Sequence, residues 1–230
     1  MIVFDLKKKE LFDLVNDETT PPSIILEHCS QNIYDAIKNK KLTPARIISS
    51  IYQIAEGMKY IHFKKVIHRD LKPSNIVIAE DGTIKISDFG VSKMIDPESG
   101  SLSFTTGIGT LFFMAPEIIN ENDEYDEKVD VYSFGVLTFF ILSGGKMPKI
   151  KIPEICSGKK AEIPNEFSQL AKNLIDSCWN FDPNQRPSFD EICTLLEDNE
   201  YRLIDLDEAG MNEALGLINQ HKKRIPSYSH

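Results

Sequence analysis

The chain has 230 residues, and its 35 acidic and 26 basic side chains give a formal net charge of −9. With 41% hydrophobic and 27% charged residues, the composition is typical of a globular protein with one main domain. The acidic balance argues against nucleic acid as the main partner. Because no run of about 18 apolar residues occurs, we expect no membrane span.

The four cysteines are Cys29, Cys156, Cys178 and Cys193. They show neither a CxxC pair nor a neighbouring histidine at zinc-binding spacing. This pattern predicts reduced, mostly packed thiols in an intracellular, cytoplasmic protein. The N-terminus begins apolar and then turns basic, which is the reverse of a secretory signal.

The first predicted elements are strands. Residues 1–29 contain two β-type runs, at 1–4 and at 23–29. The polar, proline-containing stretch 16–22 lies between them and favours a turn or loop.

Two helices have clear signals. In the first, at 43–65, Thr43 is a good N-cap, Pro44 suits the first turn, and apolar residues follow helical spacing. The second, at 129–145, is almost wholly apolar. It is short for a membrane span and contains Asp130, so a buried central helix is expected.

Between these helices, residues 75–87 predict two short strands joined by a tight turn at Asp81–Gly82. Residues 91–113 lack periodicity and are rich in Ser, Thr and Gly. A loop of this length in a compact domain is usually functional.

Further helices are predicted near 166–179 and 188–197. In the tail, residues 208–224 place Met211, Leu215 and Ile218 on one helical face, which favours a helix that packs or binds a partner. Its basic end, HKKR, suits a helix C-terminus and is also compatible with a nuclear-import patch.

The strongest chemical signal is the string HRDLKPSN followed by DFG, which contains Asp70, Lys72, Asn75 and Asp88. Phosphoryl transfer needs a carboxylate to orient a hydroxyl, a cation for phosphate charge, and oxygen ligands for Mg²⁺. These strings, in this order and at this distance, resemble the protein kinase family. The resemblance implies an α+β, protein kinase-like fold with a mainly helical large lobe and a partial small-lobe sheet.

The resemblance also implies roles and partners. Asp70 would be the catalytic base, Lys72 the phosphate partner, and Asn75 and Asp88 the Mg²⁺ ligands, with ATP as the phosphoryl donor. The string LKPSN is similar to the serine/threonine type, so the acceptor would be a protein Ser or Thr. In GTLFFMAPE, Thr110 is expected to bond to Asp70 and Lys72. The string CWNFDPNQRPSF resembles the tyrosine-kinase-like branch of serine/threonine kinases.

Further matches to this family are structural. Glu117 and Arg186 would form a buried ion pair, Asp130 would accept hydrogen bonds from the HRD backbone, and His68 would stack with Phe89. Because a buried carboxylate is costly when unpaired, the proposed bonds to Asp130 explain its place in an apolar segment.

Arg69 directly precedes the expected base. A half-buried arginine prefers a bidentate anion, and the resemblance implies a phosphorylated residue of the following loop. Thr106 is the best candidate, and Ser101, Ser103 and Thr105 are weaker ones. Ordinary solvated loop hydroxyls are the alternative.

Residues 23–29 align with the last small-lobe strand and the hinge. On that alignment Leu26 is the gatekeeper, backbone groups of Glu27 and Cys29 contact adenine, and Val77 forms the floor of the nucleotide site. A plain buried strand is the alternative.

No glycine precedes Gly57, and no lysine lies in an apolar strand near the N-terminus. We therefore expect residues 1–29 to form a partial small lobe, 30–197 the large lobe, and 198–230 a tail. The glycine-rich loop, strand lysine and helix glutamate of the kinase template are unmatched. A non-catalytic kinase-like binding module or an inactive fragment is therefore the alternative function.

Overall fold

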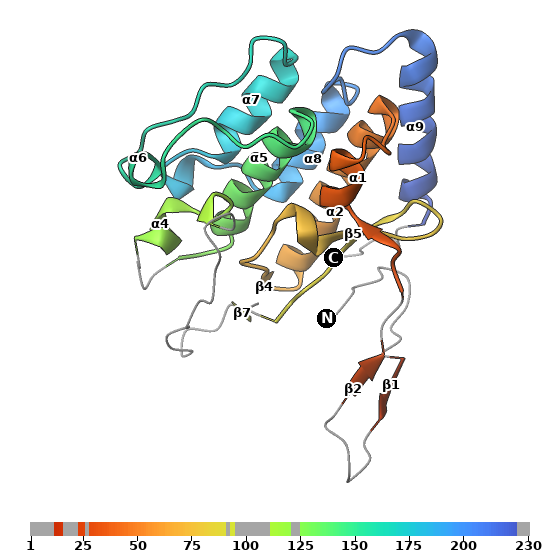
Figure 1. Ribbon diagram of the computed structural model, residues 1–230, viewed down its shortest axis with the longest axis horizontal. Coiled ribbons are helices and arrows are strands. Elements are labelled where there is room, and N and C mark those ends of the chain that lie inside the picture. Colours follow the sequence, from red (N-terminus) through yellow and green to blue (C-terminus); the bar gives the residue numbers. More distant parts are fainter. Residues whose placement is uncertain are drawn as a thin grey trace.

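The computed structural model describes residues 12–15, 23–25, 28–90, 93–94, 111–120 and 125–224. Figure 1 shows these parts as a helical body with short strands at one side. In chain order the elements are β1 (Phe12–Val15), β2 (Ser23–Ile25), β3 (Gln31–Asn32), α1 (Ile33–Lys38), α2 (Pro44–Phe63), β4 (Val66–Ile67), η1 (Pro73–Asn75), β5 (Ile76–Ile78), β6 (Ile84–Ile86), β7 (Lys93–Met94), α4 (Pro116–Ile119), α5 (Lys128–Leu142), α6 (Ile152–Cys156), α7 (Gln169–Cys178), η2 (Pro183–Gln185), α8 (Phe189–Asp198) and α9 (Glu208–Lys222).

Helices α2 and α5 form the centre of the body. The Thr43 hydroxyl accepts a hydrogen bond from the Arg46 amide (3.2 Å) and so caps α2, with Pro44 in the first turn. Helix α5 is buried on all sides and packs against α2 and α7. Both predicted helices are confirmed. Within the described residues, no helix combines the length and the apolar character needed to cross a membrane.

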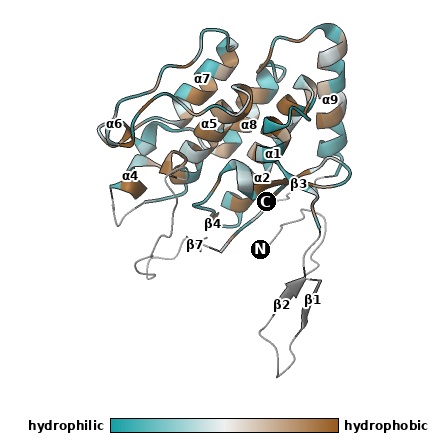
Figure 2. Cartoon of the chain, in the orientation of Figure 1, coloured by the Kyte–Doolittle hydropathy of each residue, from teal (hydrophilic) through white to brown (hydrophobic). Residues whose placement is uncertain are grey.

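Apolar side chains from the helices and from the β5–β6 hairpin share one core. In Figure 2, hydrophobic residues (brown) lie along the inner helices, including α2. Cys178 and Cys193 lie in this core as reduced thiols, as expected. Burial raises the pKa of the Cys178 thiol to about 12, so the thiol is protonated at neutral pH.

The strands form small antiparallel sheets. Strands β3, β5 and β6 make one sheet in that order, and β4 pairs with β7. The β5–β6 turn contains Gly82 at φ 80°, a conformation that glycine adopts readily, and the Thr83 amide donates to Asp81 Oδ1 (2.9 Å). The predicted hairpin within 75–87 is therefore confirmed.

The N-terminal strand prediction needs correction. Strand β1 lies at Phe12–Val15, which was not predicted, and pairs with β2 with a register shift. Its FDLV sequence alternates only weakly and carries an aspartate, which disfavours strand in propensity. Strand β2 lies at Ser23–Ile25, residues 26–27 lie outside the described residues, and residues 28–30 are irregular. The run at 1–4 lies outside the described residues.

The tail helix is present as α9. The Asp207 side chain caps it by accepting from the Gly210 amide (2.8 Å). Met211 and Ile218 are buried and Leu215 is half-buried, as expected from their common helical face. Helix α9 packs on α2 at the edge of the body (Figure 1).

Candidate active site

Three of the predicted catalytic side chains meet in the loop between β4 and β5. Lys72 Nζ lies 2.7 Å from Asp70 Oδ2, and Asn75 Nδ2 donates to the same oxygen (2.9 Å) and to the Asp70 carbonyl (2.8 Å). The Asp70 side chain stays 15% exposed, so solvent or a substrate can reach it. Among the described residues no donor contacts Asp70 Oδ1, and this oxygen can accept a proton from a hydroxyl.

A buried carboxylate holds this loop in place. Asp130, at the start of α5, is fully buried and accepts from the backbone amides of His68 (2.8 Å) and Arg69 (2.7 Å). The prediction for Asp130 is confirmed. The bonds also stabilise Arg69 at φ 66°, which is unusual for a residue with a side chain. His62 Nε2 lies 2.9 Å from Asp130 Oδ2, a partner that sequence reasoning missed.

The β5–β6 hairpin brings Asp88 next to Asn75. Asn75 directly precedes β5 and Asp88 follows β6 after one residue, Ser87. Both the amide (2.8 Å) and the hydroxyl (3.0 Å) of Ser87 donate to the Asn75 carbonyl, which fastens the two ends of the hairpin together. Ser87 was not singled out from the sequence, although its place before DFG was a usable signal.

The backbone after Ser87 turns sharply. Asp88 is exposed and has φ 66°, and the Gly90 amide lies within hydrogen-bonding reach of its Oδ1 (3.4 Å). The rings of His68 and Phe89 meet edge to face with centroids 4.8 Å apart, and His68 Nε2 lies 3.0 Å from the Ser87 carbonyl oxygen. The expected His68–Phe89 contact is thus confirmed.

Asn75 and Asp88 fit a hard divalent cation. The Asn75 amide nitrogen donates to Asp70, so its carbonyl oxygen, which accepts a long bond from the Ser74 hydroxyl (3.4 Å), is the atom that can bind a metal. The Asp88 carboxylate is a second oxygen donor of the kind that hard cations prefer. Mg²⁺ is usually bound by one or two carboxylates together with substrate phosphates and water, so the donor set agrees with this ion.

The segment after the long loop is fastened to the helical body. Arg186 forms two hydrogen bonds with Glu117, Nη1 to Oε1 at 2.6 Å and Nη2 to Oε2 at 2.9 Å. Both residues are buried, and the predicted ion pair is confirmed. The Ser133 hydroxyl of α5 also donates to the Phe113 carbonyl (2.6 Å), a second attachment that the sequence did not indicate.

The structure describes only some of the residues that were predicted to contact the nucleotide. Val77 is buried in β5 and pairs with Asn32 of β3, and Cys29 is half-buried just before β3. Leu26 and Glu27 lie outside the described residues. The roles of Glu27, Cys29 and Val77 in adenine binding therefore stay predictions.

The loop residues expected to be phosphorylated, Ser101, Ser103, Thr105 and Thr106, lie outside the described residues, as does Thr110. Arg69, their expected partner, is buried. Its Nη1 donates to the hydroxyl of Tyr125 (2.7 Å). The phosphate contact to Arg69 stays a prediction.

Comparison with known proteins agrees with this geometry. The protein kinase domain model matches residues 10–195. A probable serine/threonine-protein kinase of Dictyostelium discoideum is 36% identical over 195 residues, covering 78% of this chain and 20% of the relative. Mitogen-activated protein kinase kinase kinase 12 of Rattus norvegicus is 36% identical over 183 residues, covering 76% of this chain and 20% of that protein.

Mitogen-activated protein kinase kinase kinase 13-B of Xenopus laevis is likewise 36% identical over 183 residues, with 76% of this chain and 18% of the relative covered. The chain thus spans about a fifth of the length of these relatives. The family match extends over most of the chain and includes all four residues of the candidate site. The chain belongs to the protein kinase domain family.

Proposed function

We propose that the chain transfers the terminal phosphoryl group of ATP to serine or threonine hydroxyls of a protein substrate. The observation that carries the proposal is the convergence of Lys72 Nζ and Asn75 Nδ2 on Asp70 Oδ2. The names of the relatives, which are serine/threonine-protein kinases and mitogen-activated protein kinase kinase kinases, support the same class.

In this reaction Asp70 orients the acceptor hydroxyl and takes its proton as the oxygen attacks the phosphorus in line with the leaving ADP oxygen. Lys72, 2.7 Å from Asp70, offsets negative charge on the transferring group. Asn75 and Asp88 would hold Mg²⁺. When bound, this ion neutralises charge that develops on the phosphate oxygens.

The Asn75–Asp70 bonds and the bonds to Asp130 keep Asp70 in its working position before substrate arrives. Such preorganisation contributes much of the rate in phosphoryl transfer, because the protein acts mainly by positioning. The reduced thiols Cys178 and Cys193 support an intracellular location for this activity.

The test is the variant Asp70→Asn in a radiolabelled phosphate-transfer assay with a generic Ser/Thr protein substrate. The amide can still accept from Lys72 but cannot take up the hydroxyl proton, so transfer should fall by about 10²–10⁴-fold. Asp198→Asn, an exposed change on α8, is the matched control and should keep full activity. Undiminished transfer by the Asp70 variant contradicts the proposal.

A second function is a non-catalytic module that binds proteins. Within the 230 residues no glycine precedes Gly57, so the glycine-rich loop of the kinase template is unmatched in this sequence. A thermal-shift titration with ATP and Mg²⁺, run beside the transfer assay, separates the two. Stabilisation by nucleotide without any transfer supports the module, whereas transfer supports the enzyme.

A further inference from the structure

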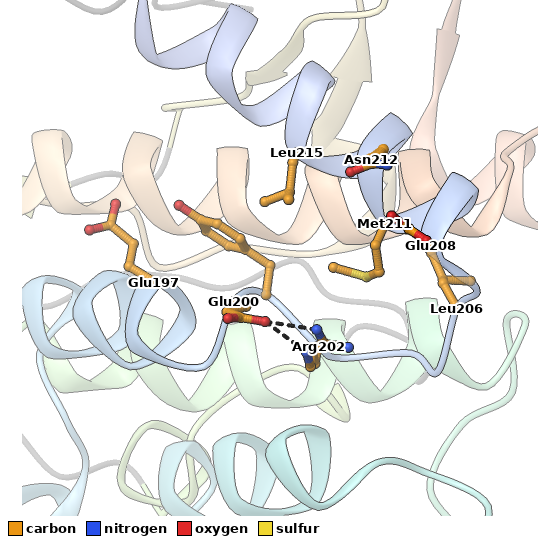
Figure 3. Close-up of a pocket in the computed structure, with 9 residues that line it drawn as sticks. Glu197, Glu200, Arg202, Leu206, Glu208, Met211, Asn212 and Leu215 are labelled. Atoms are coloured by element: carbon orange, nitrogen blue, oxygen red, sulfur yellow. Dashed lines mark hydrogen bonds and ion pairs between the residues drawn. The ribbon is translucent and has the colours of Figure 1, made fainter.

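A hollow lies between the end of α8, the loop that follows it, and α9 (Figure 3). It has a volume of about 510 Å³. We name it the tail groove. Its apolar lining includes Leu206, Met211 and Leu215, and its acidic lining is Glu197, Glu200 and Glu208.

The walls of the tail groove are fixed without a ligand. Lys222 Nζ near the end of α9 lies 2.6 Å from Glu197 Oε1 of α8, and the Tyr52 hydroxyl of α2 donates to the same oxygen (2.8 Å). The Lys222 ammonium also lies over the rings of Tyr52 (5.4 Å) and Tyr201 (5.6 Å). A preformed groove loses little entropy when it binds a partner.

Helix α9 is fastened at a second point. Arg224, just beyond α9, donates to Asp81 and to the Thr83 hydroxyl (2.6 Å) in the β5–β6 turn. At the other end, Thr43 at the start of α2 donates to Glu213 (3.3 Å). Together these contacts hold α9 along its length, so the groove keeps its shape.

The segment that forms most of the groove is acidic. Residues 197–213 contain seven acidic side chains and one basic side chain, Arg202. That base is occupied, because its guanidinium binds Glu200 Oε2 through Nε (3.0 Å) and Nη2 (2.7 Å) (Figure 3). Glu208 is exposed in the first turn of α9. Two of the three lining carboxylates are thus paired within the molecule, Glu197 with Lys222 and Glu200 with Arg202. Both bonds from Arg202 end on Glu200 Oε2, so Glu200 Oε1 and the Glu208 carboxylate are the lining oxygens that a basic group of a partner can reach.

We propose that the tail groove is a docking site for a short segment of a partner protein in which apolar side chains are flanked by Lys or Arg. The apolar side chains would contact Leu206, Met211 and Leu215, and the basic ones would lie against Glu200 and Glu208. Opposite charge at a rim around an apolar centre is the usual arrangement of a protein interface. The site lies C-terminal to residues 10–195, which the kinase family model matches.

The experiment measures fluorescence anisotropy of a short labelled peptide of alternating Lys and Leu with the full chain. Reversing two rim charges in Glu200→Lys/Glu208→Lys should weaken binding by about tenfold or more, because complementary charge is replaced by repulsion. The control Glu80→Lys/Glu162→Lys makes the same change in net charge at two exposed positions outside the groove and should bind as the wild type does.

Two further probes test the apolar floor. A peptide in which every Leu is replaced by Ser, and the variant Leu215→Ser with the original peptide, should each bind several-fold more weakly. Wild-type affinity in both cases overturns the proposal, since charge alone would then explain binding. Equal loss in the two charge-reversal variants overturns it as well.

Sedimentation of the free chain provides the last check. A monomer agrees with a groove open to a different protein. A dimer that the rim reversal dissociates shows a second copy of the chain in the groove and overturns the proposal. None of these measurements needs phosphotransfer, so their outcome is independent of the proposed function.

Discussion

The carboxylate that holds the backbone of the catalytic loop is buried, whereas the ion pairs that fasten α9 lie at the surface. Asp130, which binds the loop backbone, is fully buried, and so is the side chain of Arg186 that secures Glu117. By contrast, the Lys222–Glu197 and Arg224–Asp81 pairs are a third or more exposed on each side. Charged side chains are therefore buried in the first region and exposed to solvent in the second.

The burial of an ion pair determines how much stability is lost when one partner is removed. Removing one partner of a buried pair leaves a charge without compensation, which costs several kcal/mol. A surface pair is screened by water and salt and contributes roughly 0–1 kcal/mol. We therefore expect a single substitution of a buried polar residue at the catalytic loop to lower the free energy of unfolding by several kcal/mol. A single substitution in an ion pair of α9 should lower it by less than about 1 kcal/mol.

The largest effect is expected for Glu117→Gln. Arg186 would keep its charge in a buried site with a neutral partner, so unfolding free energy should fall by about 3–5 kcal/mol. Urea denaturation measures the loss. Glu200→Gln, which weakens the exposed pair with Arg202, is the control and should change stability by less than about 0.5 kcal/mol. Similar losses of stability in both variants would show that the buried pair contributes no more than the exposed one.

A slightly smaller effect is expected for Asp130→Asn. One oxygen acceptor becomes an amide donor that faces the backbone amides of His68 or Arg69, so stability should fall by about 3 kcal/mol. Phosphotransfer should fall with it, because Asp70 follows directly in the loop. Urea denaturation and the transfer assay give the two values. Full stability in this variant would show that the loop does not depend on Asp130.

The third prediction concerns pH and the buried histidine of α9, His221. Burial, helped by the Arg224 charge, lowers the pKa of His221 to about 4 from 6.5. The unfolded state therefore binds a proton at higher pH than the folded state. Stability from this site is full above about pH 6.5 and decreases as the pH falls towards 4, by roughly 2–3 kcal/mol in total.

The measurement is the free energy of unfolding between pH 7 and pH 4 for the wild type and for His221→Gln. The difference between the two proteins gives the contribution of His221. The Gln side chain does not titrate in this range, so the variant should lose less stability on acidification. Parallel curves for the two proteins would show that His221 is not desolvated in the folded state.

The smallest effect is expected for Arg224→Ala. Its ion pair with Asp81 is exposed and its bond to Thr83 is only partly buried, so the loss should be about 0.5 kcal/mol and should shrink at high salt. Urea denaturation at low and high salt gives both numbers. A loss above about 2 kcal/mol would place this contact in the same class as Asp130.

Local sequence signals were sufficient for the long helices. Thr43 and Pro44 mark the start of α2, and the apolar run with Asp130 marks α5 as buried. Two-residue strands such as β3 and β4 were not predicted, because a strand that short is defined by its partner across the sheet rather than by its own residues. Strand β1 was missed because its residues alternate only weakly and include an aspartate.

The sequence by itself determined the family and the long helices, and it predicted the four site residues, because these depend on residue type, spacing and the chemistry of each side chain. Only the tertiary structure decided that Lys72 and Asn75 meet on one oxygen of Asp70, that His62 and Ser87 support the loop, and that α8 and α9 enclose an acidic groove. The contacts to Asp70 come from residues close to it in sequence, but they depend on the turn of a loop whose backbone the distant Asp130 holds. The His62–Asp130 contact and the groove arise where separate helices pack together, and no local pattern encodes which surfaces will meet.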